Sequence, residues 1–276
     1  MKKFTTINEN DPKLIVFIDE LPLWSAPFAL KILDKVIPAK NLTVLDIGCG
    51  TGVPLIELAS RLGDSCTVYG IDPWKEAIER IKIKTNNFGI NNIILFNSHA
   101  EKIPLTDNSI NLIISNNGLN NVQDLGQVLS ECHRILKPGG KLIFTMNTEE
   151  TMCEFYDVFE TVLSEMGLTK LISEMYRHIH QKRKPLDEVY QLIEKSGFRH
   201  LSTDRDIFYY SFTDGSAMFS HFFIRLAFLG PWLEIVPEDK RRVVFNEIER
   251  RINKIAKKEG NFRLSIPFAV IETEAR

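Results

Sequence analysis

The chain has 276 residues, of which 44% are hydrophobic and 25% charged, a composition typical of an ordinary globular domain with or without a substantial lid. Its formal net charge of −2 gives no general attraction to a phosphate backbone, so the composition argues against a nucleic-acid partner. The most apolar stretch, 219–232, is too short to span a membrane and contains charged and proline residues, so no membrane span is expected.

The cysteines and the start of the chain indicate the compartment. The four cysteines lie at positions 49, 66, 132 and 153, without a Cys-x-x-Cys pair and without the spacing of a metal site. The first residues are polar and lack a signal-peptide pattern. We therefore expect a cytoplasmic protein with reduced thiols and no bound metal. His178 and His180 do not suggest a metal either, because residues two apart on a helix point away from each other.

Strands and helices alternate from about residue 43 to residue 147, which is typical of a parallel sheet covered on both faces. Strands are predicted over 43–47, 67–71, 93–96, 110–114, 141–146, 208–212 and 264–271. Helices are predicted over 55–62, within 150–182, and over 185–196, 217–229 and 237–258. The Gly230-Pro231 pair is expected to end the helix over 217–229.

The first predicted strand runs directly into a glycine-rich loop that reads Val-Leu-Asp-Ile-Gly-Cys-Gly-Thr-Gly from Val44 to Gly52. Glycine is needed where a backbone turns sharply and a ligand comes close, because a β-carbon would block the approach. The dinucleotide fingerprint requires its third glycine three residues after the second, where this chain has Val53. The loop therefore predicts a nucleotide-like ligand, but not a nicotinamide dinucleotide.

Four further segments follow this loop in order. They are Asp72 at the end of the second strand, Ser98–Glu101 with Ile103-Pro104-Leu105 after it, Asn111–Asn117, and Leu136–Gly140. With the leading acid Asp46, these segments resemble the motifs of the class I S-adenosylmethionine methyltransferases, especially those that act on quinones, sterols and similar metabolites. The resemblance covers roughly residues 43–147. It implies a Rossmann-like, doubly wound α/β fold with seven strands, mostly parallel with an antiparallel last strand, and a helical cap.

The resemblance also implies the cofactor, S-adenosyl-L-methionine, which would leave as S-adenosyl-L-homocysteine. The implied cofactor-binding residues are Asp46, Gly48, Cys49, Gly50, Asp72, Pro73, Trp74, His99, Ala100, Glu101 and Asn116. The Asp72 carboxylate can accept hydrogen bonds from both ribose hydroxyls. Trp74 either stacks on the adenine or belongs to the core, and Cys49 is interpreted as a small structural residue rather than a nucleophile.

One position departs from the family pattern. Relatives usually carry an aspartate where this chain has His99, and that acid accepts a hydrogen bond from the adenine amino group. A neutral imidazole can accept through one ring nitrogen, which would make the contact depend on protonation. The alternative is that the Ala100 backbone and packing hold the adenine, with His99 on the loop surface.

The implied reaction is direct in-line transfer of the methyl group to a small, apolar or aromatic metabolite, in which the protein mainly positions the reactants and excludes water. The run 115–121 follows the fourth strand, at the edge where open α/β sheets bind ligands. We assign Asn116 to the methionyl end of the cofactor and expect Asn117 or Asn120 to contact the substrate. The alternative for each asparagine is a turn, for which Asn-Asn-Gly is also well suited.

Insertions at about 150–182 and 214–260 are rich in aromatic residues and predict a helical cap. The rings form either an apolar substrate pocket or only the core of the cap. Within the cap, His221 is the candidate general base, with simple packing as its alternative. Residues 1–40, including Trp24, are expected to form a helical lid on a methyltransferase domain of residues 41–276. The rival functions are an RNA or protein methyltransferase, and an S-adenosylmethionine-binding module without transferase activity.

Overall fold

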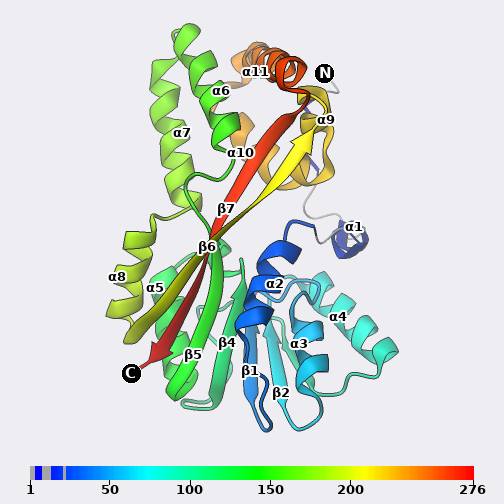
Figure 1. The fold of residues 1–276 in the computed structure, drawn as a ribbon, viewed down its shortest axis with the longest axis vertical. Helices are drawn as coiled ribbons and strands as arrows, with labels where there is room; N and C mark the ends of the chain where they lie inside the picture. Colours follow the sequence, from blue (N-terminus) through cyan, green and yellow to red (C-terminus); the bar gives the residue numbers. More distant parts are fainter. Residues whose placement is uncertain (1–3, 8–13, 21–22) are drawn as a thin grey trace. The chain divides into compact units, whose positions relative to one another are not determined.

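The computed structural model describes residues 4–7, 14–20 and 23–276 (Figure 1). The chain divides into two compact units. The sheet unit comprises Pro12–Thr148, Lys184–Asp206 and Phe268–Arg276. The helical unit comprises Met1–Asp11, Glu149–Arg183 and Ile207–Pro267.

Within the described residues, seven strands form one sheet in the order β3-β2-β1-β4-β5-β7-β6. The strands are β1 (Thr43–Ile47), β2 (Thr67–Ile71), β3 (Ile93–Phe96), β4 (Ile110–Asn116), β5 (Leu136–Asn147), β6 (Phe198–Phe212) and β7 (Phe262–Ala275). Neighbouring strands from β3 to β5 are parallel, whereas β7 runs antiparallel to β5. This order confirms the expected Rossmann-like fold, and it places the topological switch point between β1 and β4.

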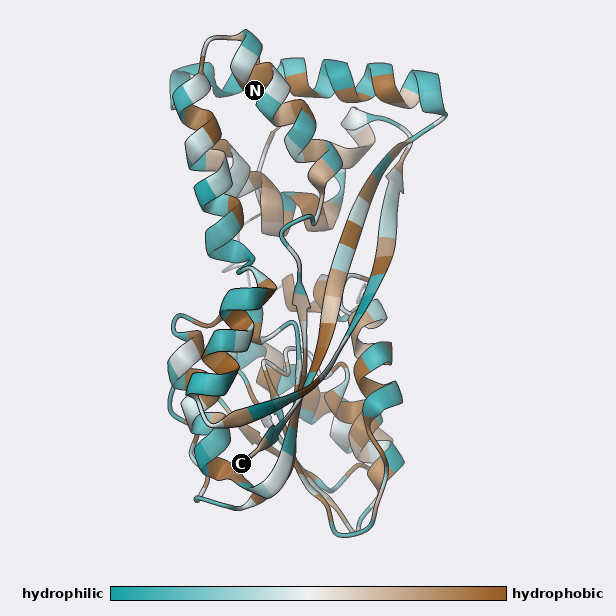
Figure 2. Ribbon diagram, turned by 60° about the vertical axis from the view of Figure 1, so that its left-hand side comes forward, coloured by the Kyte–Doolittle hydropathy of each residue, from teal (hydrophilic) through white to brown (hydrophobic). Residues whose placement is uncertain are grey.

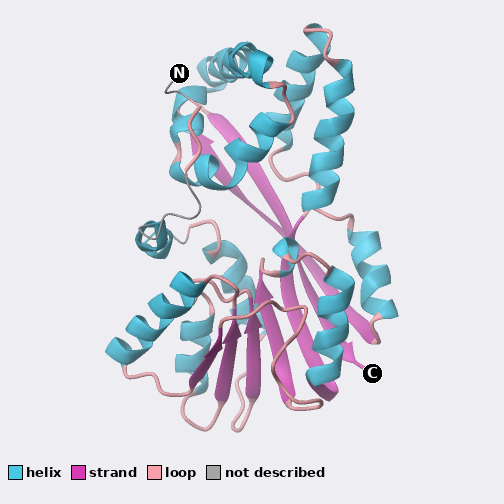
Figure 3. Ribbon diagram, turned by 180° about the vertical axis from the view of Figure 1, so that it is seen from behind, coloured by secondary structure: helices cyan, strands magenta, loops and turns pink. Residues whose placement is uncertain are grey.

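Helices lie on both sides of the parallel strands in the sheet unit (Figure 3). The helices of the sheet unit are α1 (Leu14–Glu20), α2 (Ala26–Lys35), α3 (Leu55–Leu62), α4 (Lys75–Phe88), the short 3₁₀ helix η1 (Leu119–Asn121), α5 (Leu125–Ile135) and α8 (Leu186–Lys195), of which α1 and η1 lie beyond the ends of the strands. Each connecting helix turns one apolar stripe toward the sheet; α3, for example, buries Leu55, Leu58, Ala59 and Leu62. One continuous core joins β1, β4 and β5 to α5 and α8.

The first three strands and α3 begin and end where the hydrophobic pattern predicts, but β6 and β7 are longer than predicted. β6 is the edge strand, and most of its residues between Phe198 and Phe212 are exposed or half-buried. The hydrophobic pattern therefore marks only its more apolar second half. β7 continues through polar residues because their charges are paired: Glu272 contacts Lys141 at 2.7 Å, and Glu274 contacts Arg199 at 2.8 Å.

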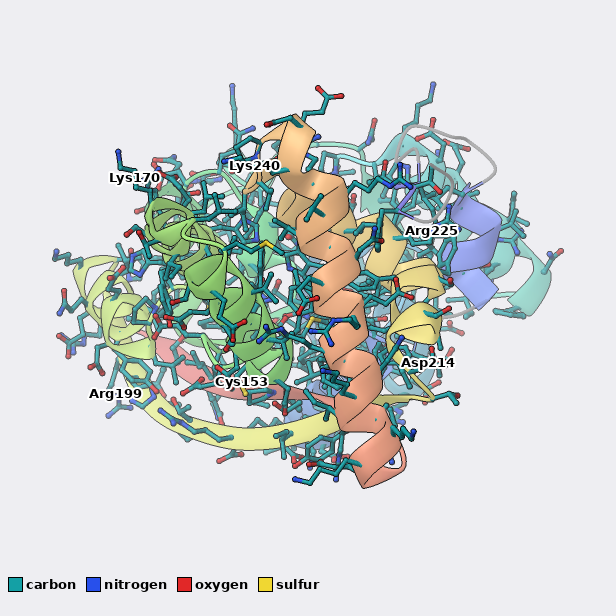
Figure 4. All side chains as sticks on the ribbon, turned by 90° about the horizontal axis from the view of Figure 1, so that it is seen from above. Cys153, Lys170, Arg199, Asp214, Arg225 and Lys240 are labelled. Atoms are coloured by element: carbon teal, nitrogen blue, oxygen red, sulfur yellow. The ribbon has the colours of Figure 1, made fainter. Side chains whose placement is uncertain are left out.

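The helical unit contains α6 (Cys153–Glu165), α7 (Thr169–Lys182) and α11 (Glu238–Glu259), as expected for the segments 150–182 and 237–258. Figure 4 labels Cys153 at the start of α6. The interior is aromatic: the Phe155 ring stacks on Trp232 with centroids 3.8 Å apart, and the Trp232 indole N–H donates to the Tyr156 hydroxyl at 3.0 Å. All three side chains are buried. For them the packed core, rather than an open substrate pocket, is the correct interpretation.

The single helix predicted over 217–229 is wrong. The structure has α9 (Gly215–Ser220), a π-helical turn η2 (Ile224–Phe228) and α10 (Leu229–Glu234) instead. The Asp214 side chain caps α9 by accepting from the Ala217 N–H at 2.8 Å, and His221 ends it with extended backbone angles. Pro231 does not stop a helix, because α10 follows η2 directly and runs through Pro231 to Glu234.

Hydropathy along the ribbon alternates on most helices of both units, with polar and apolar residues on different faces (Figure 2). Among the residues that the structure describes, no helix is both long enough and apolar enough to cross a bilayer.

Candidate functional site

The glycine loop turns away from the end of β1 in a backbone conformation that needs glycine. The Gly48 N–H donates to the Ile71 carbonyl at 2.9 Å, which holds the loop against the end of β2. Gly48 has φ +73°, and a β-carbon there would lie 2.7 Å from the Gly118 Cα of the loop after β4. At Gly50 (φ +48°), by contrast, a β-carbon would meet nothing within 4 Å. The loop is thus packed tightly at Gly48 and open at Gly50, where a ligand can approach the backbone.

The Asp72 carboxylate lies beside this open position. Its Oδ2 accepts from the Gly50 N–H at 2.9 Å and its Oδ1 from the Trp74 N–H at 2.8 Å. The side chain of Asn97 holds the turn by donating to the carbonyls of Asp72 and Pro73, at 3.0 and 2.9 Å. Burial raises the pKa of Asp72, although the two N–H donors and the nearby His99 lower it. Each carboxylate oxygen keeps a free lone pair for a ligand hydroxyl.

Asp46 is the most unusual residue of the site. It lies near the end of β1 with no exposed surface, and neither of its carboxylate oxygens has a hydrogen-bond partner within the described residues. Burial, and next the charge of Asp72, raise the pKa of Asp46 well above its ordinary value. A buried carboxyl without a partner is costly unless a donor or a cation meets it. This orphaned group therefore fits a positively charged or hydrogen-bond-donating ligand.

Cys49 is buried inside the loop, and burial raises the pKa of its thiol well above the ordinary value. Its sulfur also packs closely over Gly70, where an added β-carbon would come within 3.0 Å of it. A protonated, buried thiol is a poor nucleophile. The structure thus agrees with a packing role for this side chain.

The loop after β3 contributes the next predicted group of residues. His99 is exposed, and its charge acts on Asp72, so the imidazole lies near that carboxylate. Ala100 is buried. Glu101 Oε1 accepts from the Gln123 N–H at 2.9 Å and thereby ties this loop to the start of α5, and a contact of Glu101 with the cofactor stays a prediction.

Asn116, at the end of β4, uses its amide to brace the protein. Its Nδ2 donates to the carbonyl of Ser25 at 3.2 Å and to that of Val53 at 3.4 Å. The side chain is buried and connects the segment before α2 with the glycine loop. A direct role toward the methionyl end of the cofactor stays a prediction.

The next asparagines form a cluster with one residue that the sequence interpretation missed. Asn117 adopts φ +62°, and its Nδ2 donates to Asn147 Oδ1 at 3.2 Å. Asn120 donates from its Nδ2 to Asn117 Oδ1 at 2.5 Å and to Asn147 Oδ1 at 3.4 Å. The two predicted substrate residues are thus brought together, and Asn147 at the end of β5 joins them.

Asn147 and Gly118 could have been found from the sequence. Asn147 is a polar residue at the end of a buried strand, a signal like the one that identified Asp72 after β2. Gly118 is needed because a β-carbon there would lie 2.3 Å from the Ile47 carbonyl oxygen. Its signal is the glycine itself, next to a run of asparagines that explains a turn but not a close approach.

The N-terminal segment is attached to the glycine loop by charge. Asp19 of α1 contacts Arg80 at 2.6 Å and also Lys84, both on α4, and Lys84 donates to the Thr51 carbonyl. Burial raises the pKa of Asp19, but these cations outweigh it and lower the pKa overall. Trp24 packs near Phe28 with ring centroids 5.9 Å apart. Residues 1–3, 8–13 and 21–22 of the predicted lid lie outside the described residues.

His221 belongs to the helical unit, whereas the glycine loop, Asp72 and the asparagine cluster belong to the sheet unit. Its ring packs against Tyr210 and Phe212, with centroids 5.6 and 5.4 Å away. Its Nδ1 is buried without a partner among the described residues, and burial lowers the pKa of the imidazole. These surroundings are those of a packed histidine with one unused nitrogen, and its catalytic role stays a prediction.

A family model described as a methyltransferase domain matches residues 38–197, more than half of the chain. The chain belongs to the class I S-adenosylmethionine methyltransferases. This membership accounts for the glycine loop, for the switch point between β1 and β4, and for the strand order with an antiparallel β7. S-adenosylmethionine is the cofactor of this methyltransferase.

Two similar curated proteins carry the name demethylmenaquinone methyltransferase. The protein of Geobacillus sp. is 30% identical over 169 residues, which cover 58% of this chain and 71% of the relative. The protein of Oceanobacillus iheyensis is 32% identical over 139 residues, which cover 49% of this chain and 58% of the relative. The match thus spans little more than half the length of the Oceanobacillus protein.

Among solved structures, a SAM-dependent methyltransferase from Aquifex aeolicus superposes with a TM-score of 0.54 at 23% identity, covering 71% of this chain and 92% of that one. At this identity the likeness concerns the fold, which it supports independently of the sequence motifs. The rest of the present chain has no counterpart in that superposition.

Proposed function

We propose that this methyltransferase transfers the methyl group of S-adenosylmethionine to a small, apolar or aromatic metabolite. The observation that carries the proposal is the buried carboxyl of Asp46 together with the half-buried carboxyl of Asp72, whose Oδ2 accepts from the Gly50 N–H where the backbone is open. One of these groups has no partner within the described residues, and the other keeps lone pairs free. The two together match a ligand that carries both a cation and a pair of hydroxyls.

In this proposal Asp72 accepts from the ribose hydroxyls and Asp46 faces the α-ammonium of the cofactor. Gly48 and Gly50 let the backbone approach, Cys49 fills the space beneath, and Pro73, Trp74, His99 and Ala100 surround the adenine. When bound, S-adenosylmethionine supplies a methyl group on a cationic sulfur, already activated for transfer. The residues of the chain then bind, orient and exclude water, which is most of what such a reaction needs.

Binding of S-adenosylhomocysteine is expected to release a proton from Asp46. Burial raises the pKa of Asp46 in the free protein and so favours the protonated carboxyl there. An ammonium group placed beside it stabilises the carboxylate, lowers the pKa and drives the proton out. Calorimetric titration should therefore be more exothermic in Tris, which takes up protons exothermically, than in phosphate. In Asp46→Asn the difference between the buffers should vanish; a difference that persists would assign the proton to another group.

The substrate class is proposed from the relatives. Their printed name specifies demethylmenaquinone, and we extend this class of substrate to the present chain. We expect transfer of labelled methyl from S-adenosylmethionine to reduced demethylmenaquinone when the two are incubated with the protein. The matched control is Asp72→Ala, which should lose most of the transfer. Transfer to RNA or protein instead, with none to the quinol, would contradict the proposed class.

His221 is proposed as the general base if the acceptor is a hydroxyl or a carbon acid. Its pKa is lowered from 6.5 by burial, so the imidazole is neutral and able to accept a proton at pH 7. The acidic limb of the rate profile should accordingly lie below pH 6.5. His221→Ala is expected to lower kcat by about 10²–10⁴. His178→Ala is the matched control, a half-buried histidine of the same unit; equal rates in both variants would exclude His221 as the base.

We also propose that residues 1–40 cover the cofactor and that the insertions at about 150–182 and 214–260 cover the substrate. The ion pairs of Asp19 with α4 support the first assignment, because they hold α1 to the helix that follows Asp72.

We further propose a cytoplasmic location. The four cysteines are free, which supports it.

A further inference from the structure

The asparagine cluster after β4 and β5 has a defined amide orientation. Asn147 is 7% exposed, and its Oδ1 accepts from Asn117 Nδ2 and from Asn120 Nδ2. Asn120 Nδ2 also donates to Asn117 Oδ1. In each of these contacts a donor meets a carbonyl oxygen, so turning any one amide over would set like groups against each other.

Two buried atoms of the cluster are without a partner in the part of the chain that the structure describes. They are the acceptor Asn120 Oδ1 and the donor Asn147 Nδ2. Unpaired polar atoms in a buried side chain are costly, and a ligand that satisfies them removes this cost. These are one acceptor and one donor on two amides that contact each other, and a hydroxyl group, which can donate and accept at the same oxygen, is complementary to such a pair.

The sheet order separates this pair from the cofactor residues. Asp72 follows β2 and Asp46 lies near the end of β1, whereas Asn120 and Asn147 follow β4 and β5. In the order β2-β1-β4-β5, these two sets lie on opposite sides of the switch point. The cationic end of the cofactor is also better matched by the buried acid than by a neutral amide pair. The cluster is therefore placed for the methyl acceptor.

We infer that Asn120 and Asn147 form a subsite for a hydroxyl group of the methyl acceptor, which donates to Asn120 Oδ1 and accepts from Asn147 Nδ2. Asn117 is a positioning residue that bonds to both amides. The inference rests on the proposed function and narrows its substrate class to hydroxylated aromatic compounds, such as phenols and hydroquinones. A quinone carbonyl or a methyl ether can satisfy only the donor, Asn147 Nδ2.

The test compares two probes with the same ring, naphthohydroquinone and its dimethyl ether. Each probe is titrated under oxygen-free conditions into the protein saturated with S-adenosylhomocysteine. The pH is about 8, so that the carboxyl introduced by the variant described below is ionised. We expect the hydroquinone to bind roughly tenfold more tightly than the ether, because the ether leaves Asn120 Oδ1 unpaired. Equal affinity of the two probes, or no binding of either, would overturn the inference.

The sharper variant is Asn147→Asp, which keeps the side-chain shape and the acceptor for Asn117 and Asn120 but removes the donor. It should weaken hydroquinone binding about tenfold and leave binding of S-adenosylhomocysteine unchanged. Asn87→Asp is the matched control, the same substitution at an exposed position of α4 away from the cluster, and it should change neither affinity. Unchanged hydroquinone binding in Asn147→Asp, or a loss of S-adenosylhomocysteine binding, would overturn the subsite.

The titration of S-adenosylhomocysteine into the wild-type protein separates the two proposals. If it binds and the hydroquinone shows no preference, the hydroxyl subsite fails and the cofactor assignment stands. If it does not bind at all, the proposed function fails together with the subsite.

Discussion

Asp72→Ala is expected to weaken S-adenosylhomocysteine binding about 5- to 150-fold, which corresponds to roughly 1–3 kcal/mol. The Asp72 carboxylate has two functions. It accepts from the N–H groups of Gly50 and Trp74, and so fixes the open part of the glycine loop, and it has lone pairs left for the ribose hydroxyls. The substitution removes both functions at once. Calorimetric titration measures the effect directly.

Two further variants separate these functions. Asp72→Asn keeps one acceptor oxygen and the side-chain shape, so it should lose less affinity than Asp72→Ala. Asp64→Ala removes an exposed acid in the loop after α3 and should bind as the wild type does. If Asp72→Ala bound S-adenosylhomocysteine with unchanged affinity, the ribose would lie elsewhere and the assignment of the end of β2 would be wrong.

Gly48→Ala is expected to lower the free energy of unfolding by about 2–5 kcal/mol. Part of this loss comes from the positive φ of +73°, which costs an alanine about 1–2 kcal/mol. The rest comes from the new β-carbon, which would lie 2.7 Å from the Gly118 Cα. That neighbour is backbone and cannot rotate away, so one of the two loops must shift. Urea unfolding followed by circular dichroism gives the difference.

Gly89→Ala is the matched control for this experiment. Gly89 has a similar φ of +67° in the left-handed region, but a β-carbon there meets nothing within 4 Å. Its substitution should therefore cost only the conformational part, about 1–2 kcal/mol. Equal losses in Gly48→Ala and Gly89→Ala would mean that the two loops are not in close contact.

Local patterns predict the parallel half of the fold well. β1, β2 and β3 are short runs of mostly apolar residues, buried for the most part in β1 and β2 and half-buried in β3, so their hydrophobic runs mark their ends. The last two strands are different, because most of β6 is exposed or half-buried and the polar end of β7, although the strand is mostly buried, is held by ion pairs. The helix predicted over 217–229 fails for a similar reason: its apolar residues are continuous, but the chain breaks at His221, and Pro231 lies within a helix instead of ending one.

The candidate site likewise contains some residues that the sequence pattern identifies and others that it does not. Asp46, Gly50 and Asp72 were predictable because each directly reflects the geometry of a strand end. The roles of the asparagines could not be predicted individually, since an amide that braces the backbone, as in Asn116, has the same sequence signal as one that belongs to the cluster. Only the partners of each amide distinguish them, and the unpaired atoms of Asn120 and Asn147 emerge from three-dimensional contacts alone.

The carboxyls of Asp46 and Asp72 and the open glycine loop are the groups proposed to hold S-adenosylmethionine. Calorimetric titration of the wild-type protein with S-adenosylhomocysteine, with NAD as the control ligand, tests this assignment most directly. Saturable binding of S-adenosylhomocysteine with a dissociation constant on the order of micromolar, and no heat from NAD, is the predicted result. Absence of binding by S-adenosylhomocysteine, or saturable binding of NAD at the same site, would contradict the assignment.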